Sequence, residues 1–230
     1  MPKRLATVQD HVDDILQALA ALAGAKFTPL PSDAEKPSEI LAGMITALKD
    51  FLSPIGFSYN KGKRTFRRKS GDFEHLITIQ SDSNNYAGVR AACWVHISVV
   101  SNSLKAWRSA NHIHESEYVF SITLSDETSL SQLVWDFIAQ EHRMAELHNL
   151  LHTIQSAALP VFQDWISVET ANQAISSTKI INRLDDQAEI ALWLGNKAAA
   201  IEILQRKPDR QSVHDGMREL ALKFGLPAVV

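Results

Sequence analysis

The chain has 230 residues, a formal net charge of -3 and a single cysteine. A chain of this length can bury a core of ordinary size without disulfides, and one thiol has no second thiol with which to pair. The negative net charge gives no overall attraction for nucleic acid or anionic lipid, and no apolar run reaches the roughly 18 to 20 residues of a membrane span. We therefore expect a cytoplasmic protein with no membrane segment.

The first 27 residues have the pattern of an amphipathic helix. Apolar side chains recur at helical spacing between Val8 and Ala23, and aspartates, beginning with Asp10, lie on the opposite face. These aspartates interrupt a stretch that would be continuously apolar in a signal peptide. We predict an N-terminal helical arm over residues 1–27. Because no partner for its apolar face follows directly in the chain, a homodimer is one way to cover that face.

After a proline-rich linker at residues 28–37, a helical stripe over residues 38–52 gives way to alternating apolar and polar side chains. Alternation of this kind is typical of strands with one buried face. The expected strands lie at residues 57–60, 65–69, 73–80, 89–99 and 117–124. We predict an α+β domain over residues 38–165, in which an antiparallel meander sheet of about five strands is covered by helices.

Helical spacing returns after the last of these strands. A long helix is expected over residues 128–158, where it would cross the sheet, and Pro160 should limit it. Shorter helices are expected at residues 168–176, 185–194, 197–205 and 213–224. We therefore predict a helical C-terminal subdomain over residues 166–230.

The strand expected over residues 89–99 has two different faces. The core face carries alternate apolar side chains, namely Val89, Ala91, Cys93, Val95, Ile97 and Val99. The opposite face carries Trp94 among hydrogen-bonding side chains, and tryptophan is an anchor favoured at protein interfaces. The C-terminal helices are an equally good cover for this face. The partner-binding residues that we predict are Trp94, His96, Arg90, Gln80, Asp185 and Asp186, the last two because acidic groups can meet a basic patch on a partner.

Positive charge is concentrated around the first expected hairpin. The basic residues there are Lys61, Lys63, Arg64, Arg67, Arg68 and Lys69. Tyr59 and Phe66 lie among them as stacking surfaces, a combination that can hold a nucleic-acid backbone. The negative net charge argues against nucleic acid, and edge strands often carry Lys and Arg as protection against aggregation. A nucleic-acid or regulatory binding module using residues 61–69 is therefore the alternative function.

Histidines occur close together at two places, neither with a complete metal-binding motif. His148 and His152 have the i, i+4 spacing of zinc ligands with Glu141 two turns earlier, but an asparagine follows the first histidine where a zinc protease needs its general base. His112 and His114 would need a further ligand from elsewhere in the chain. We expect no metal site, and a metal-dependent enzyme at the first group remains the third alternative.

No catalytic signature emerges from the rest of the chain. It has no glycine-rich phosphate loop and no GxSxG motif, and Cys93 is expected to point into the core. We expect neither enzymatic activity nor a cofactor.

Three motifs in the middle of the chain form a recognisable series: LSPIGF at 52–57, KGKRTFRRKSGD at 61–72 and ITIQ at 77–80. With ALWLGN at 191–196 and AAAI at 198–201, they resemble the bacterial family called domain of unknown function 4304 over about half of the chain. The resemblance implies a small bacterial α+β domain of a kind found among genes of toxin and immunity systems. It carries over no catalytic residues, and it implies a protein-binding role as an immunity protein that neutralises a toxin.

Overall fold

The computed structural model describes residues 35–124, 134–176, 181, 183–208 and 210–227. The predicted arm over residues 1–27 lies outside this part of the chain. Among the described residues, no helix is both long and apolar enough to cross a membrane.

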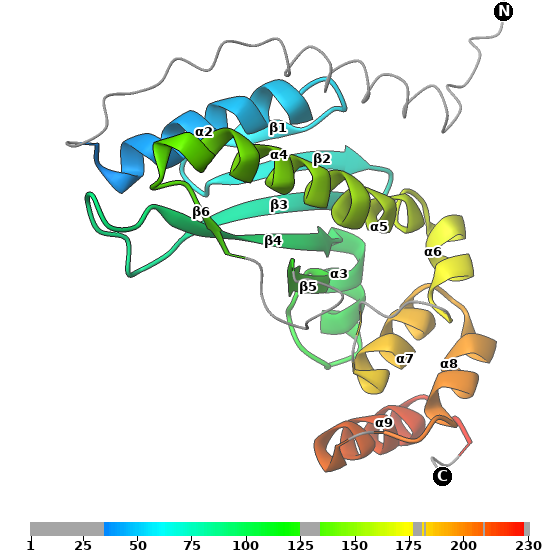
Figure 1. Ribbon diagram of the computed structural model, residues 1–230. Helices are drawn as coiled ribbons and strands as arrows, with labels where there is room; N and C mark the ends of the chain where they lie inside the picture. Colours follow the sequence, from blue (N-terminus) through cyan, green and yellow to red (C-terminus); the bar gives the residue numbers. More distant parts are fainter. Residues whose placement is uncertain (1–34, 125–133, 177–180, 182, 209, 228–230) are drawn as a thin grey trace, which may run out of the picture. The chain divides into compact units, whose positions relative to one another are not determined.

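The described strands form an antiparallel sheet with the order β1-β2-β3-β4-β5, and β6 pairs with β4 (Figure 1). The strands are β1 (Ser58–Asn60), β2 (Thr65–Ser70), β3 (Phe73–Ser81), β4 (Ala92–Val100), β5 (Tyr118–Thr123) and β6 (Trp135–Asp136). The order β1 to β5 follows the chain, as in a meander. The predicted α+β class and the meander of about five strands are therefore confirmed.

The chain divides into two compact units that interleave along the sequence. Of the described residues, the first unit contains 35–68, 76–96, 123–124 and 134–158, and the second contains 69–75, 97–122 and those from 159 to 227. We describe each unit by itself. The domain boundaries expected at residues 27, 38, 165 and 166 stay predictions.

In the first unit, helices α2 (Pro37–Leu52) and α4 (Arg143–Thr153) pack against each other, α2 next to β1 and α4 next to β6. Helix α2 begins with Pro37, whose missing N–H costs nothing at a helix start, and the Lys36 N–H donates to the Glu39 carboxylate at 3.2 Å. Its apolar stripe is buried, as its helical spacing predicts: Ile40, Leu41, Met44, Leu48, Phe51 and Leu52.

The prediction of a long helix over residues 128–158 is wrong for the first part of this range. Residues 128–133 lie outside the described chain, and the next residues form β6, in which Trp135 is fully buried and pairs with Cys93. The Asp136 carboxylate accepts from the N–H groups of Ala91 and Ile138, which holds the backbone extended. Long-range strand pairing thus overrides local helical spacing, and after the short 3-10 helix η1 (Gln140–His142) the α-helix begins only at Arg143.

The same helical run also ends later than predicted. It continues through the π-helix η2 (Ile154–Ala158) into α5 (Leu159–Asp164), so it passes Pro160. Proline cannot donate the i to i-4 hydrogen bond, and its ring clashes with the preceding turn of a regular α-helix. The wider π turn directly before Pro160 provides a way to accommodate it.

The second unit contains helices α3 (Asn102–Ala110), α6 (Val168–Ala174), α7 (Leu184–Trp193), α8 (Lys197–Leu204) and α9 (Gln211–Lys223), together with α5. Helix α7 packs against α3, α8 and α9. The four C-terminal helices lie where they were predicted, within two residues at each end. Helix α3 lies between two of the expected strands, where the sequence analysis predicted no helix. The Ser101 hydroxyl caps it by accepting from the Leu104 N–H at 3.3 Å.

Candidate functional site

The predicted partner-binding residues do not form one site. Trp94, His96 and Gln80 lie on one face of the sheet in the first unit, whereas Arg90 lies in the connection between β3 and β4. Asp185 and Asp186 belong to the second unit, in the first turn of α7. Each group is therefore considered in its own surroundings.

A polar row crosses the sheet face that carries Trp94. The His96 Nε2 donates to the Gln80 side-chain oxygen at 2.7 Å, and its Nδ1 accepts from the Thr123 hydroxyl at 2.8 Å. Gln80 and His96, both predicted as contact residues, thus lie next to each other. Trp94 and His96 are half-buried, whereas the alternate residues Cys93 and Val95 are fully buried, so the predicted division of β4 into a core face and a mixed face is confirmed.

His96 is satisfied as a neutral imidazole, and burial lowers its pKa. The folded chain therefore takes up this proton less readily than the unfolded chain, whose histidine pKa is about 6.5. We expect stability to be complete above that pH and to fall as the pH is lowered through about 6.5 toward the folded-state pKa. Urea unfolding of the native protein and of His96→Gln between pH 8 and 5 checks this. The variant should lose less stability on acidification, and equal losses would contradict the assignment.

The connection between β3 and β4, residues 82–91, forms a tightly bonded loop that we call the Tyr86 loop (Figure 1). The carboxylate of Asp82 is buried at its base, where it accepts from the Asn84 N–H at 2.8 Å and from the Arg90 guanidinium at 2.8 and 3.0 Å. These bonds, the backbone one first, lower the pKa of Asp82. The Asn85 amide bridges to the Ala92 backbone in both directions, at 2.6 and 2.8 Å.

The tip of this loop presents two large apolar side chains to solvent. Tyr86 is 71% exposed and Val89 is 68% exposed, and a backbone bridge between Tyr86 and Arg90 closes the turn that carries them. The sequence analysis placed Val89 on the core face of a strand, which is wrong, because β4 begins only at Ala92. Gly88, whose φ of 71° favours glycine, was the available signal for a turn at this point.

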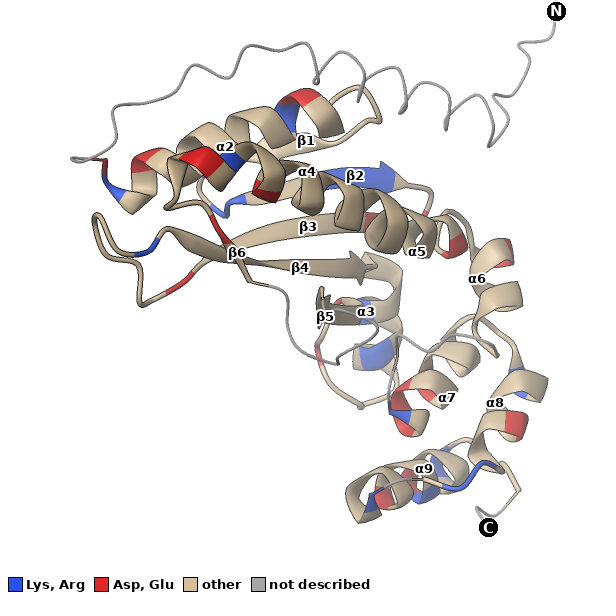
Figure 2. Cartoon of the chain, in the orientation of Figure 1, with Lys and Arg blue, Asp and Glu red and all other residues tan. Residues whose placement is uncertain are grey.

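The basic hairpin residues are divided between two faces of β2. Lys61, Lys63 and Arg64 are exposed in the turn before β2, and Arg67 and Lys69 are exposed on the strand. Figure 2 marks basic positions along β2 in blue. Arg68 points to the other face, where its guanidinium lies 4.7 Å from the centre of the Phe57 ring and donates to the Ile55 carbonyl at 3.3 Å. Burial lowers the pKa of Arg68. Arg68 therefore packs against the protein, while the other five form the exposed basic group.

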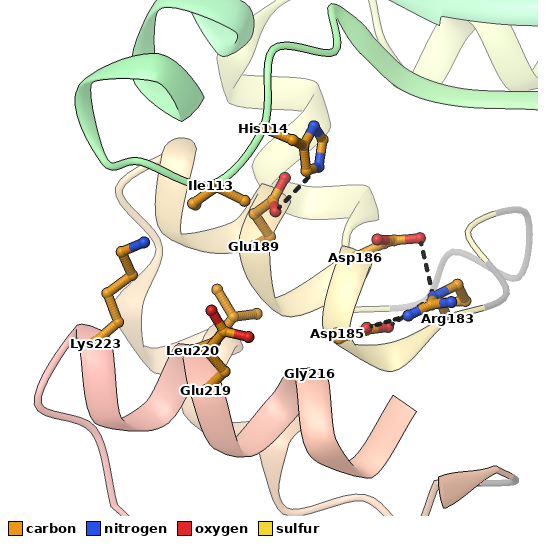
Figure 3. A pocket seen from close by; sticks show the side chains of 10 residues that line it. All are labelled: Ile113, His114, Arg183, Asp185, Asp186, Glu189, Gly216, Glu219, Leu220 and Lys223. Atoms are coloured by element: carbon orange, nitrogen blue, oxygen red, sulfur yellow. Dashed lines mark hydrogen bonds and ion pairs between the residues drawn. The ribbon is translucent and has the colours of Figure 1, made fainter. Parts of the chain in front are cut away.

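In the second unit, a pocket of about 270 Å³ is lined by residues of α7, α9 and the segment after α3 (Figure 3). The lining residues are Ile113, His114, Arg183, Asp185, Asp186, Glu189, Gly216, Glu219, Leu220 and Lys223. It brings together the predicted Asp185 and Asp186 with His114. Asp185 is itself buried, and the Nε and Nη2 of Arg183 both donate to its carboxylate. Asp185 is therefore not available to meet a partner directly, contrary to the expectation from the sequence. Glu189 and Glu219, on α7 and α9, were missed because only the packing of these helices brings them to the pocket.

The remaining chemical candidates are separate from one another. His148 and His152 are exposed on α4, and among the described residues no three His, Cys, Asp or Glu side chains are placed to hold a metal ion. The carbonyl of His112 accepts from Lys223 at 3.1 Å. Cys93 lies in the core as predicted, where burial above all, and then the charge of Asp136, raises the pKa of its thiol to about 12.

Comparison with known proteins identifies the sheet region. A family model described as a domain of unknown function, DUF4304, matches residues 48–164, about half of the chain. The chain belongs to the DUF4304 family. The DUF4304 region begins in the last turn of α2 and ends with α5, so it contains the whole sheet and the Tyr86 loop, whereas α7 and α9 follow it. No curated protein and no solved structure matches the chain.

Proposed function

We propose that this protein is a cytoplasmic, non-catalytic binding protein that contacts a protein partner through the Tyr86 loop. The observation that carries the proposal is the exposure of Tyr86 and Val89 at the tip of a loop whose base is held by buried hydrogen bonds. Tyrosine is enriched among the residues that dominate binding energy, because it buries a large rigid surface and keeps a hydroxyl for a hydrogen bond.

The order of the loop supports this role. Binding costs free energy when flexible segments must be fixed, so a loop already fixed in the free protein keeps more of its contact energy. Arg90 was predicted as a contact residue. In this proposal it positions the loop, because it forms an ion pair with Asp82 across the base of the loop. The nearby Trp94 face offers a second, polar contact surface in the same unit.

The resemblance of the chain to the DUF4304 family implies a domain of a kind found among genes of toxin and immunity systems, and this supports a toxin as the partner. An immunity protein works by tight steric or electrostatic cover of its toxin and needs no chemistry of its own.

The loop is tested by a double variant, Tyr86→Ala with Val89→Ser. Tagged protein recovered from a bacterial lysate with nuclease present should retain a stoichiometric polypeptide through gel filtration, identified by mass spectrometry. We expect the double variant to bind that polypeptide about 30-fold more weakly or worse, which corresponds to the roughly 2 kcal/mol lost at an interface hot spot.

The matched control is Leu222→Ser, which removes an apolar side chain that is 82% exposed on α9. It should leave the affinity unchanged. Equal binding by the double variant, or equal loss by the control, would contradict the proposal.

The exposed turn of Lys61, Lys63 and Arg64, with Arg67 beside it, favours nucleic acid as the second candidate. Contacts to phosphates release counterions, so such a complex would weaken steeply as salt rises. The same capture experiment without nuclease, repeated at increasing salt, separates this candidate from a complex made by apolar side chains.

A further inference from the structure

The pocket of the second unit has an excess of carboxylate groups around a partly apolar cavity (Figure 3). Asp185, Asp186 and Glu189 come from α7, and Glu219 comes from α9. The side chains of Ile113 and Leu220 add apolar surface to the same cavity. A ligand that fits this lining would combine a cationic head with a short apolar stem.

The cations of the pocket are largely committed to particular partners. Arg183 bonds both oxygens of Asp185, at 3.1 Å from Nε and 2.5 Å from Nη2, and the amino group of Lys223 donates to a backbone carbonyl at 3.1 Å. Asp186 has only the Arg183 Nε at 3.6 Å as an ion-pair partner among the described residues. Its side chain and that of Glu219 therefore have unused acceptor capacity.

Glu189 supplies an acceptor in the interior of the pocket. Its residue is only 4% exposed, and its Oε1 accepts from the Arg108 Nε at 2.5 Å. The His114 Nε2 lies 3.6 Å from its Oε2, beyond hydrogen-bond length. Because Glu189 lines the pocket, a donor placed there can bond to this oxygen and strengthen the local charge balance.

The electrostatics of Asp186 agree with a shortage of positive charge. Burial raises the pKa of Asp186, and the neighbouring Asp185 and Glu189 raise it further, against the lowering effect of Arg183 and Arg108. A bound cation would oppose this shift by stabilising the ionised carboxylate.

We propose that this pocket binds a guanidinium group, carried by a small molecule or by an arginine side chain of a polypeptide. A guanidinium is planar, always charged and weakly hydrated, and its five donors can be shared among the carboxylates that line the pocket. The stem of the ligand would lie on Ile113 and Leu220. The proposal concerns the second unit and does not depend on the Tyr86 loop.

The test is a titration of the full ¹⁵N-labelled chain with N-acetylarginine methylamide, followed by NMR, with N-acetyl-lysine methylamide and free arginine as parallel probes. We expect saturable shifts of the amides around Glu189 and Gly216, and at least tenfold weaker binding of the lysine probe. Tighter binding of free arginine than of the blocked probe would assign the ligand to small molecules, and the reverse would assign it to polypeptides.

Two variants of partly or fully exposed side chains, Asp186→Asn and Glu219→Gln, should each weaken the arginine probe at least fivefold. The control Glu202→Gln removes a carboxylate of an exposed ion pair on α8 and should change nothing. An unchanged thermal midpoint shows that a variant is folded. No saturable binding, equal affinity for the lysine probe, or equal loss in the control would overturn the proposal, and none of these results bears on partner capture by the Tyr86 loop.

Discussion

Replacing Arg108 by methionine should lower the free energy of unfolding by about 3–5 kcal/mol, the usual cost of leaving one member of a buried ion pair alone. Arg108 is 3% exposed and Glu189 is 4% exposed. Without the guanidinium, the mostly buried Glu189 carboxylate would lose the hydrogen bond and the opposite charge that Arg108 supplies.

Arg108 also fixes the chain ahead of β5. Its Nη1 donates to the carbonyl of Ser116 at 2.9 Å and to that of Tyr118 at 2.7 Å. The substitution should therefore loosen the segment from Ser116 to Tyr118 in addition to lowering stability. Urea unfolding followed by circular dichroism measures the stability, and hydrogen exchange of these amides reports the local effect.

The double variant Arg108→Met with Glu189→Leu separates the lost charge from the lost volume. Since apolar replacement of a complete buried pair is often neutral or stabilising, it should recover most of the stability. The exposed pair of Arg206 and Glu202 gives the matched comparison, and Glu202→Met should cost no more than about 1 kcal/mol. A loss in Arg108→Met as small as in this control would show that the buried pair contributes little.

Replacing Gly216 by alanine should destabilise the protein by about 1–3 kcal/mol, the range of an overpacked core. An alanine in a helix interior normally stabilises by up to about 1 kcal/mol relative to glycine. At Gly216, however, the added Cβ would overlap the carboxylate of Asp185 and lie 3.1 Å from its Cγ. Because Arg183 holds that carboxylate in a buried place, it cannot simply rotate away.

Gly43 provides the matched control, because it lies inside α2 and an added Cβ would meet nothing within 4 Å. Gly43→Ala should therefore raise the free energy of unfolding by up to about 1 kcal/mol. Opposite signs for the two substitutions, measured by urea unfolding, are the expected result. If both variants were stabilised, α7 and α9 would not approach as closely as the structure has them.

The fold places the two proposed contact regions in different parts of the chain. The Tyr86 loop lies inside the DUF4304 region, whereas the helices that line the pocket come after its end at residue 164. The C-terminal helices thus complete a pocket to which the family region contributes Ile113 and His114. We expect substitutions in α7 or α9 to leave the role proposed for the Tyr86 loop unchanged, and substitutions at the loop tip to leave the role proposed for the pocket unchanged.

The sequence by itself determined the fold class. Burial of one face requires apolar side chains at a regular spacing, which differs between helices and strands. Alternation identified β3, β4 and β5, helical spacing identified α2 and the C-terminal helices, and the same pattern placed Cys93 inward and Trp94 on the mixed face. Turn residues located the hairpin between β1 and β2. These features depend on residues near one another in the chain.

Tertiary structure alone decided the features that depend on distant partners. The residues of β6 became a strand because they pair with the start of β4, and Val89 became exposed because β4 begins later than its apolar pattern suggests. Arg68 is not part of the exposed basic group, because its guanidinium packs on the Phe57 ring and donates to the Ile55 carbonyl in the turn after α2. The pocket exists only where α7 and α9 pack, since a local pattern cannot specify which distant carboxylates will meet.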